Sequence, residues 1–127
     1  MSKIKSYGII LVVALSAILG TGIVFAQQTI EISIAPATLN LDKVDDKCVT
    51  VHADIDYDEV DCDTLTLNDI SVDSTKADDR GDLVAKFDRE AIAGLVVEGE
   101  DTLTLTLIGE TNEEESFTGT DTIRVKR

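Results

Sequence analysis

Residues 102–107 read Thr-Leu-Thr-Leu-Thr-Leu, and this alternation is the clearest structural signal in the sequence. An apolar side chain at every second position is the period of a β-strand, with one face toward a core and one toward water. Five other segments alternate in the same way: 30–34, 49–55, 64–67, 83–87 and 122–125. The second face of these segments is mostly threonine or charged, which suits the solvent side of an antiparallel sheet.

Strands of this length, separated by polar turns, predict an all-β protein. We expect one antiparallel immunoglobulin-like β-sandwich of two sheets. One short stretch departs from the period of two, because Asp88 can cap a helical turn over residues 89–93 that Gly94 closes. The chain has no internal repeat and no Pro-rich linker, so it divides into an N-terminal segment, 1–26, and one β domain, 27–127.

The composition excludes several classes of function. With 127 residues the chain has room for one domain, and 43% apolar residues exclude a disordered acidic tail. It carries 25 acidic and 11 basic side chains, a formal charge of −14. Nucleic-acid binding rests on Lys and Arg side chains that neutralise phosphates, so we expect no nucleic-acid partner.

The first 26 residues have the pattern of an export signal. Two lysines precede an apolar stretch, 9–25, and small or aliphatic side chains stand one and three residues before Gln27. A signal peptidase prefers this arrangement, so we predict cleavage between Ala26 and Gln27 and a secreted or cell-surface protein. Two alternatives stay open: an uncleaved membrane anchor, the only membrane contact we expect, and a pilin-type leader cut after Gly8.

Cleavage at Ala26 would leave 101 residues, with all 25 acidic residues and 9 of the 11 basic ones, a net charge of −16. Such a surface repels itself in dilute buffer, and external salt or divalent cations would relieve the repulsion. The acidity therefore fits a soluble exported surface, adaptation to salt, or cation binding, and the sequence does not choose among them.

Cys48 and Cys62 are the two cysteines of the chain, and both follow the export segment. An even count in an oxidising compartment predicts a disulfide between them. The bridge would close a loop of about 15 residues and stabilise the fold by about 3 kcal/mol in the chain-entropy model. The alternative is two free thiols, one of which could pair between chains.

Acidic residues gather in two places, which raises the question of calcium. One cluster lies within residues 54–63, and the other is Asp78, Asp79 and Asp82. Calcium takes six to eight oxygen ligands around a loop that wraps. Gly81 supplies a turn in the second cluster, but its spacing completes no such loop. We expect no cofactor, with calcium at Asp78, Asp79 and Asp82 as the alternative.

Catalysis has little support in the sequence. His52 is the only histidine, and the alternation puts it on the polar face of a strand. The sequence has no nucleophile elbow, glycine-rich phosphate loop or metalloprotease helix. Two carboxylates can act on a glycosidic bond, but 25 acidic residues make any one pair unremarkable. We therefore expect a protein that is not an enzyme.

A series of short segments runs through the domain in a fixed order: Ile30-Glu31-Ile32-Ser33-Ile34-Ala35-Pro36, Leu39-Asn40-Leu41, Val49-Thr50-Val51, Asp58-Glu59-Val60-Asp61, Asp82-Leu83-Val84-Ala85-Lys86-Phe87-Asp88, Leu103-Thr104-Leu105-Thr106, Phe117-Thr118-Gly119-Thr120-Asp121 and Ile123-Arg124-Val125. In this order the chain resembles a β-sandwich module of exported bacterial and archaeal proteins, often found at the C-terminal end of larger surface proteins. The resemblance implies the fold and an extracytoplasmic location. It implies no activity, because the family has no agreed one.

The same resemblance implies a calcium-like loop before residues 83–87. Asp78 and Asp82 match the last part of that loop, but Ser74 and Lys76 stand where earlier oxygen ligands are expected. The cysteine pair is not part of the family pattern, and a disulfide could replace the loop as a staple.

The sequence as a whole favours an exported, non-enzymatic surface or interaction module whose partner is an extracellular protein, a glycan or a second copy. The first alternative is a subunit of an extracellular filament or matrix, in which the strand 29–34 pairs with a neighbour's sheet edge. The second is a carboxylate-dependent glycan hydrolase, which would need one carboxyl group with a strongly raised pKa.

Overall fold

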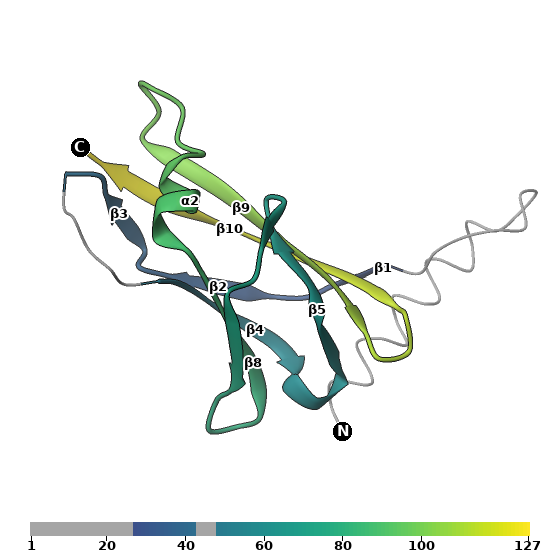
Figure 1. Ribbon diagram of the computed structural model, residues 1–127. Coiled ribbons are helices and arrows are strands. Elements are labelled where there is room, and N and C mark those ends of the chain that lie inside the picture. Colours follow the sequence, from purple (N-terminus) through teal and green to yellow (C-terminus); the bar gives the residue numbers. More distant parts are fainter. Residues whose placement is uncertain (1–26, 43–47) are drawn as a thin grey trace, which may run out of the picture.

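The computed structural model describes residues 27–42 and 48–127, and strands dominate this part of the chain (Figure 1). Sheet A consists of β1 (Gln27–Thr29), β10 (Ser116–Lys126), β9 (Thr102–Thr111), β5 (Val60–Leu67) and β6 (Ile70–Ser71) in that order, with β3 (Thr38–Asn40) also on β10. Sheet B has the order β2 (Ile32–Ala35), β4 (Val49–Asp56), β8 (Asp82–Phe87) and β7 (Ser74–Ala77). The prediction of an all-β protein with two sheets is confirmed.

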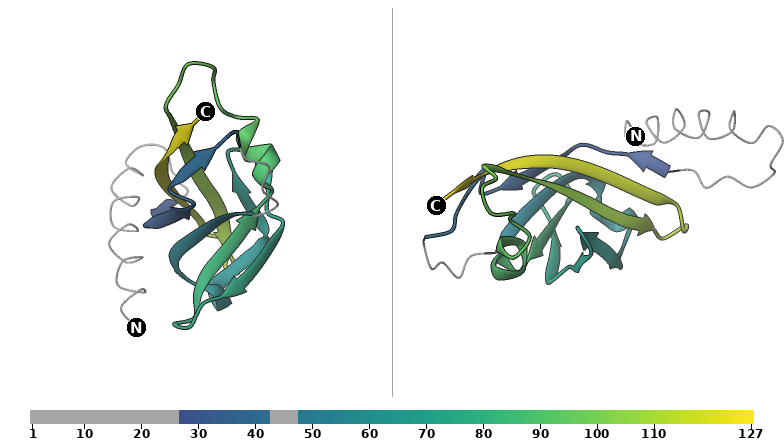
Figure 2. Two further views of the ribbon diagram at one scale, coloured as in Figure 1. Left: turned by 90° about the vertical axis from the view of Figure 1, so that its left-hand side faces the viewer. Right: turned by 90° about the horizontal axis from the view of Figure 1, so that it is seen from above.

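The two sheets enclose one hydrophobic core (Figure 2). The predicted alternation holds through it, because the apolar residues at every second position of β4, β9 and β10 are mostly buried and their neighbours mostly are not. The largest fully buried side chains include Phe87, Phe117, Leu39, Ile55, Leu65, Leu67, Leu83, Leu105 and Leu107. Val84 is an exception. It is 1% exposed although it alternates with core residues, and it lies outside the core cluster.

The predicted helical turn is present as α2 (Arg89–Ala93), but it is stabilised differently from the expectation. Asp88 occupies the N-cap position without a capping hydrogen bond from its side chain, and Gly94 ends the helix in an ordinary right-handed conformation. Ile92 is fully buried and belongs to the core. Burial of that side chain, rather than capping, holds the helix on the domain.

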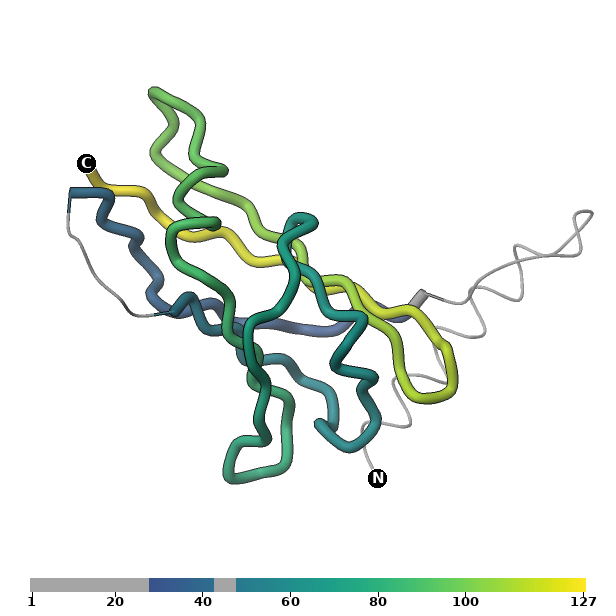
Figure 3. The backbone as a smooth tube through the Cα atoms, in the orientation of Figure 1, coloured from purple at the N-terminus to yellow at the C-terminus, as the bar shows by residue number. Residues whose placement is uncertain are grey.

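Residues 27–40, which we call the N-terminal arm, belong to both sheets (Figure 3). The arm pairs in parallel with β10 through β1 and again through β3, while β2 between them pairs with β4 of sheet B. Where the arm leaves sheet A, the Ile30 amide donates to the Thr118 carbonyl at 2.8 Å. The Ile34 amide donates to the Asp121 carboxylate at 2.9 Å. The arm therefore closes one side of the sandwich.

Side-chain hydrogen bonds continue the pairing of sheet A at the point where the backbone pairing of β5 with β9 ends. Asn68 and Asp69 form a two-residue turn between β5 and β6, both with positive φ. Such a turn matches the twist of the flanking strands. The side-chain amide of Asn68 then bonds to the backbone of β9. Its oxygen accepts from the Thr106 N–H at 2.8 Å, and its nitrogen donates to the Thr104 carbonyl at 3.1 Å. Asn68 thus occupies backbone groups of β9 beyond the end of its pairing with β5.

Candidate functional site

A shallow groove of about 380 Å³ opens on sheet B, and we take it as the candidate functional site. Three parts of the chain line it: the arm, β4 and the turn between β7 and β8. The lining residues are Glu31, Ile32, Ser33, His52, Ala53, Asp54, Asp78, Arg80 and Asp82. Four carboxylates and one guanidinium line it, so the groove is polar and rich in acidic side chains.

Strand register explains why these residues meet. Ser33 pairs with His52 across β2 and β4, and both are exposed because they point away from the core. His52 in turn pairs with Val84 of β8, which pairs with Lys76 of β7. Val84 is therefore buried on the outer face of sheet B, between longer polar residues.

The turn between β7 and β8 supplies the remaining groove residues, and Asp78 organises it. One oxygen of the Asp78 carboxylate accepts from the Arg80 amide at 2.8 Å and from the Asp82 amide at 2.9 Å. Gly81 has φ +86°, a conformation that side chains with a Cβ rarely adopt. Asp82 is 7% exposed, and the Arg80 guanidinium lies 3.7 Å from its carboxylate.

The structure brings together two of the three residues proposed for calcium. Asp78 and Asp82 line the groove, whereas Asp79 is exposed and lies outside its lining. Among the described residues, no group of three His, Cys, Asp or Glu side chains has an arrangement that could hold a metal ion. Asp78 has a structural role in the turn without a cation. The calcium site stays a prediction.

In the other acidic cluster, within residues 54–63, some residues accept backbone hydrogen bonds and others line a second hollow. Asp56 accepts a hydrogen bond from the Asp58 amide at the start of the 3₁₀ helix η1 (Tyr57–Glu59), and Asp61 accepts one from the Asp63 amide. Asp58 and Glu59 also line a second hollow, of about 220 Å³, together with Thr111, Asn112, Glu113 and Glu115 of the turn between β9 and β10. The sequence does not predict that this turn lies beside the cluster.

Cys48 and Cys62 are both half-buried and free in the structure, so the predicted disulfide is not shown. Cys48 precedes β4 of sheet B, and Cys62 lies near the start of β5 in sheet A. The whole of β4, eight residues and about 26 Å, separates Cys48 from η1, while Cys62 follows η1 by only three residues. A disulfide needs Cα atoms about 4.4–6.8 Å apart, so these positions count against a bridge within one chain.

We expect two alkylatable thiols per chain in protein that is purified without a reductant. The measurement is intact mass after alkylation in denaturant, which should add two labels to the monomer. A species that takes no label and is two hydrogens lighter would instead establish the bridge that the sequence predicts, and would require β4 and β5 to lie differently. A dimer that splits on reduction would indicate pairing between chains.

Comparisons with protein-family models, with curated proteins and with solved structures found no match to this chain. In the described part of the chain, no helix is long and apolar enough to cross a membrane. The predicted export segment, 1–26, and Ala26 of its cleavage site lie outside the described residues, which begin at Gln27 in β1.

The groove was not found from the sequence, although part of its signal is there. Charge identifies Asp78 and Asp82 as candidates, and the alternation puts His52 on the polar face of its strand. Glu31 and Ser33 have the same alternating signal on the arm. What the sequence does not give is the pairing of the arm with β4, which brings these residues to one place.

Proposed function

We propose that this protein is an exported, non-enzymatic interaction module with an immunoglobulin-like β-sandwich fold. The order of the strands supports the fold. Sheet B has four strands in the order β2, β4, β8, β7, and the opposing sheet has β5, β9 and β10 as neighbours. Numbered along the chain as A to G, these correspond to the A-B-E-D and C-F-G sheets of an immunoglobulin domain.

The observation that carries the proposed function is the shape and lining of the groove on sheet B. Sites for small molecules are concave, bury most of the ligand and are lined mainly by apolar side chains. This groove is open and lined mainly by charged and polar residues from three chain segments. Such a surface suits contact with a macromolecule at the cell surface, through Asp54 and Arg80 at its exposed rim.

The filament alternative would require part of the arm to leave its own sheets. Adding the strand 29–34 to a neighbour's sheet would withdraw Ile30 and Ile34 from their own core, where they are 9% and 4% exposed. It would also break the bonds that the arm makes to Thr118 and Asp121. We therefore propose a module that works through its surface, with the arm in its own sheets.

Fractionation of the source cells tests this proposal. We expect a chain that begins at Gln27 and stays with the washed cell surface. The charge swap Asp54→Lys/Arg80→Glu, which leaves the net charge unchanged, should release it to the medium at least about tenfold more, the equivalent of 1.4 kcal/mol in binding. Lys76→Glu/Glu98→Lys is the matched control, because it swaps one base and one acid outside the groove.

Two outcomes would contradict the proposal. A cytoplasmic chain that retains Met1 would remove export from it. Equal release of the two swapped variants, with both folded as judged by their melting temperatures, would remove the groove. A membrane-bound chain that retains residues 1–26 would favour the anchor alternative.

A further inference from the structure

The outer face of sheet A has an uncharged centre in a strongly acidic protein. We call this surface the threonine face, and it consists of Thr29, Thr66, Thr102, Thr104, Thr106, Ile108, Thr118, Thr120 and Thr122. None of these side chains is buried, and Ile108 is 45% exposed. The nine positions carry no charge in a chain with 25 acidic and 11 basic residues. The surface is therefore one on which a second acidic molecule could be tolerated.

The threonine face is also ordered before any partner arrives. Thr104 pairs with Thr122 in the strand register, and their hydroxyl oxygens are 3.0 Å apart. Thr106 and Thr120 form the next such pair, at 3.3 Å. β-Branched side chains have few rotamers, so a partner that packs on this face restricts little further motion.

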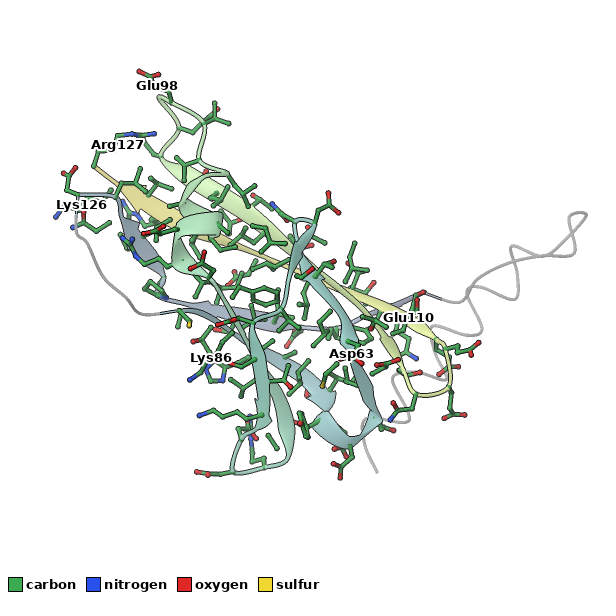
Figure 4. All side chains as sticks on the ribbon, viewed as in Figure 1. Asp63, Lys86, Glu98, Glu110, Lys126 and Arg127 are labelled. Atoms are coloured by element: carbon green, nitrogen blue, oxygen red, sulfur yellow. The ribbon has the colours of Figure 1, made fainter. Side chains whose placement is uncertain are left out.

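Outward-facing strand residues of opposite charge lie at the two ends of the threonine face. At one end Asp61 pairs in register with Glu110, and Asp63 lies nearby on β5; all three are exposed. At the other end are Arg124, paired with Thr102, and Lys126, paired with Asn40 of β3. Figure 4 shows Glu110 and Asp63 far from Lys126 on the molecule.

The distance between the two ends follows from the register. Thr102 pairs with Arg124 and Glu110 pairs with Ser116, so eight residues of β9 separate the basic end from the acidic end. At about 3.4 Å per residue this is about 27 Å. Counting only the strand positions that face outward, the surface is thus acidic at one end, neutral in the middle and basic at the other, while Glu100 and Asp101 in the loop before β9 lie beside the basic end.

We propose that the threonine face is a self-association surface whose partner is a second copy of this chain. Consider a two-fold axis that lies between the sheets A of two copies and runs perpendicular to their strands. It places the two threonine faces against each other with their strands in opposite directions. Arg124 and Lys126 of one copy then lie opposite the acidic end of the other, at both ends of the interface, with Glu110 one strand to the side and Asp61 two strands to the side. A two-fold interface needs a self-complementary surface, and this order of charges is one.

Size and charge set the expected strength of the pair. Four strands about 4.8 Å apart and about 27 Å long cover roughly 500 Å² per copy. The total of about 1,000 Å² is at the lower limit of specific interfaces, so we expect the pair to be reversible and weak. Repulsion between the two acidic molecules acts over longer distances than the ion pairs, and about 0.15 M salt screens it beyond roughly 8 Å.

This inference deepens the proposed role as an interaction module. It rests on that role only for the premise that the working surface is the face of a sheet. The groove lies on sheet B and stays open in the pair, since the pair is formed through sheet A. Self-association and binding through the groove can therefore fail independently.

Charge reversal at each end, followed by mixing, tests the proposal. Arg124→Glu/Lys126→Glu gives a chain with two acidic ends, and Asp61→Lys/Glu110→Lys gives one with two basic ends. In sedimentation velocity at 0.15 M salt we expect native protein to dimerise and each variant alone to do so at least about tenfold more weakly. An equimolar mixture of the two variants should restore the dimer, because opposite ends again meet.

Lys76→Glu/Lys86→Glu is the matched control, since it changes the net charge by the same amount as Arg124→Glu/Lys126→Glu and lies in sheet B. It should leave dimerisation within about threefold of native. The proposal is overturned if native protein stays monomeric at millimolar concentration, if the control weakens the dimer as much as the end variants do, or if two folded end variants fail to associate when mixed. None of these outcomes affects the groove or the export test.

Discussion

Replacing Phe117 with alanine is expected to lower the free energy of unfolding by about 3–5 kcal/mol. Phe117 is fully buried in β10 and pairs in register with Gly109 of β9. Its ring covers that glycine so closely that a Cβ added at Gly109 would lie 2.7 Å from the ring. Removal of the ring leaves a cavity over a residue with no side chain to fill it. A domain of this size has about 5–15 kcal/mol in all, so the variant should be near the limit of folding.

Urea unfolding followed by far-UV circular dichroism measures this loss. The midpoint should fall while the slope with denaturant stays constant, as for a change in stability alone. Phe117→Leu is the control, because it keeps most of the volume and should cost less than half as much. Equal midpoints for native protein and Phe117→Ala would mean that β9 and β10 do not pack in this register.

Replacing Gly119 with valine is expected to destabilise the domain by about 1–3 kcal/mol or more and to loosen the N-terminal arm. An added Cβ would lie 2.7 Å from the Ile32 side chain and 2.9 Å from the Ile30 carbonyl oxygen. The second of these is backbone, so the arm itself must move. In an ordinary strand the same change would be favourable, because valine suits strands and glycine weakens them. The sign of the effect thus reports the close approach.

Hydrogen exchange tests where the loss occurs. The amides of Ile30 and Ile34, which bond to Thr118 and Asp121, should exchange faster in Gly119→Val than amides in the middle of β4. Thr120→Val is the matched control one residue further on, exposed on the other face of β10, and should change stability by less than about 0.5 kcal/mol. A Gly119→Val variant as stable as native would argue against the path of the arm.

The strands and their buried faces could be predicted from the sequence because alternation depends on each strand alone. Leu105 and Leu107 are buried and Thr104 is exposed whichever strand lies alongside. Pairing is a different matter, since it depends on partners far away in the chain. The arm reads as one strand signal over residues 30–34, yet it divides between two sheets at the place where Gly119 allows it to approach β10.

The same limit explains the candidate site. Charge and spacing identified Asp78 and Asp82, but not that the Asp78 carboxylate is engaged with backbone amides of its own turn. The predicted disulfide depends on the even number of cysteines and on the expected compartment. Neither of these indicates that β4 separates Cys48 from Cys62. Val84 shows a local version of the problem, because its burial on the outer face depends on the polar residues beside it in register.

The arm also determines when the domain can close during its biogenesis. Its bond from Ile34 to Asp121 joins residues 87 apart in the chain, and β1 and β3 are both paired with the last strand. Sheet A therefore lacks one edge until β10 has been synthesised, and loop closure over that span is slow. A nascent chain without its final dozen residues has an open sandwich. If the chain is exported as we propose, this dependence on the last strand would favour passage through a translocation channel before the sandwich closes.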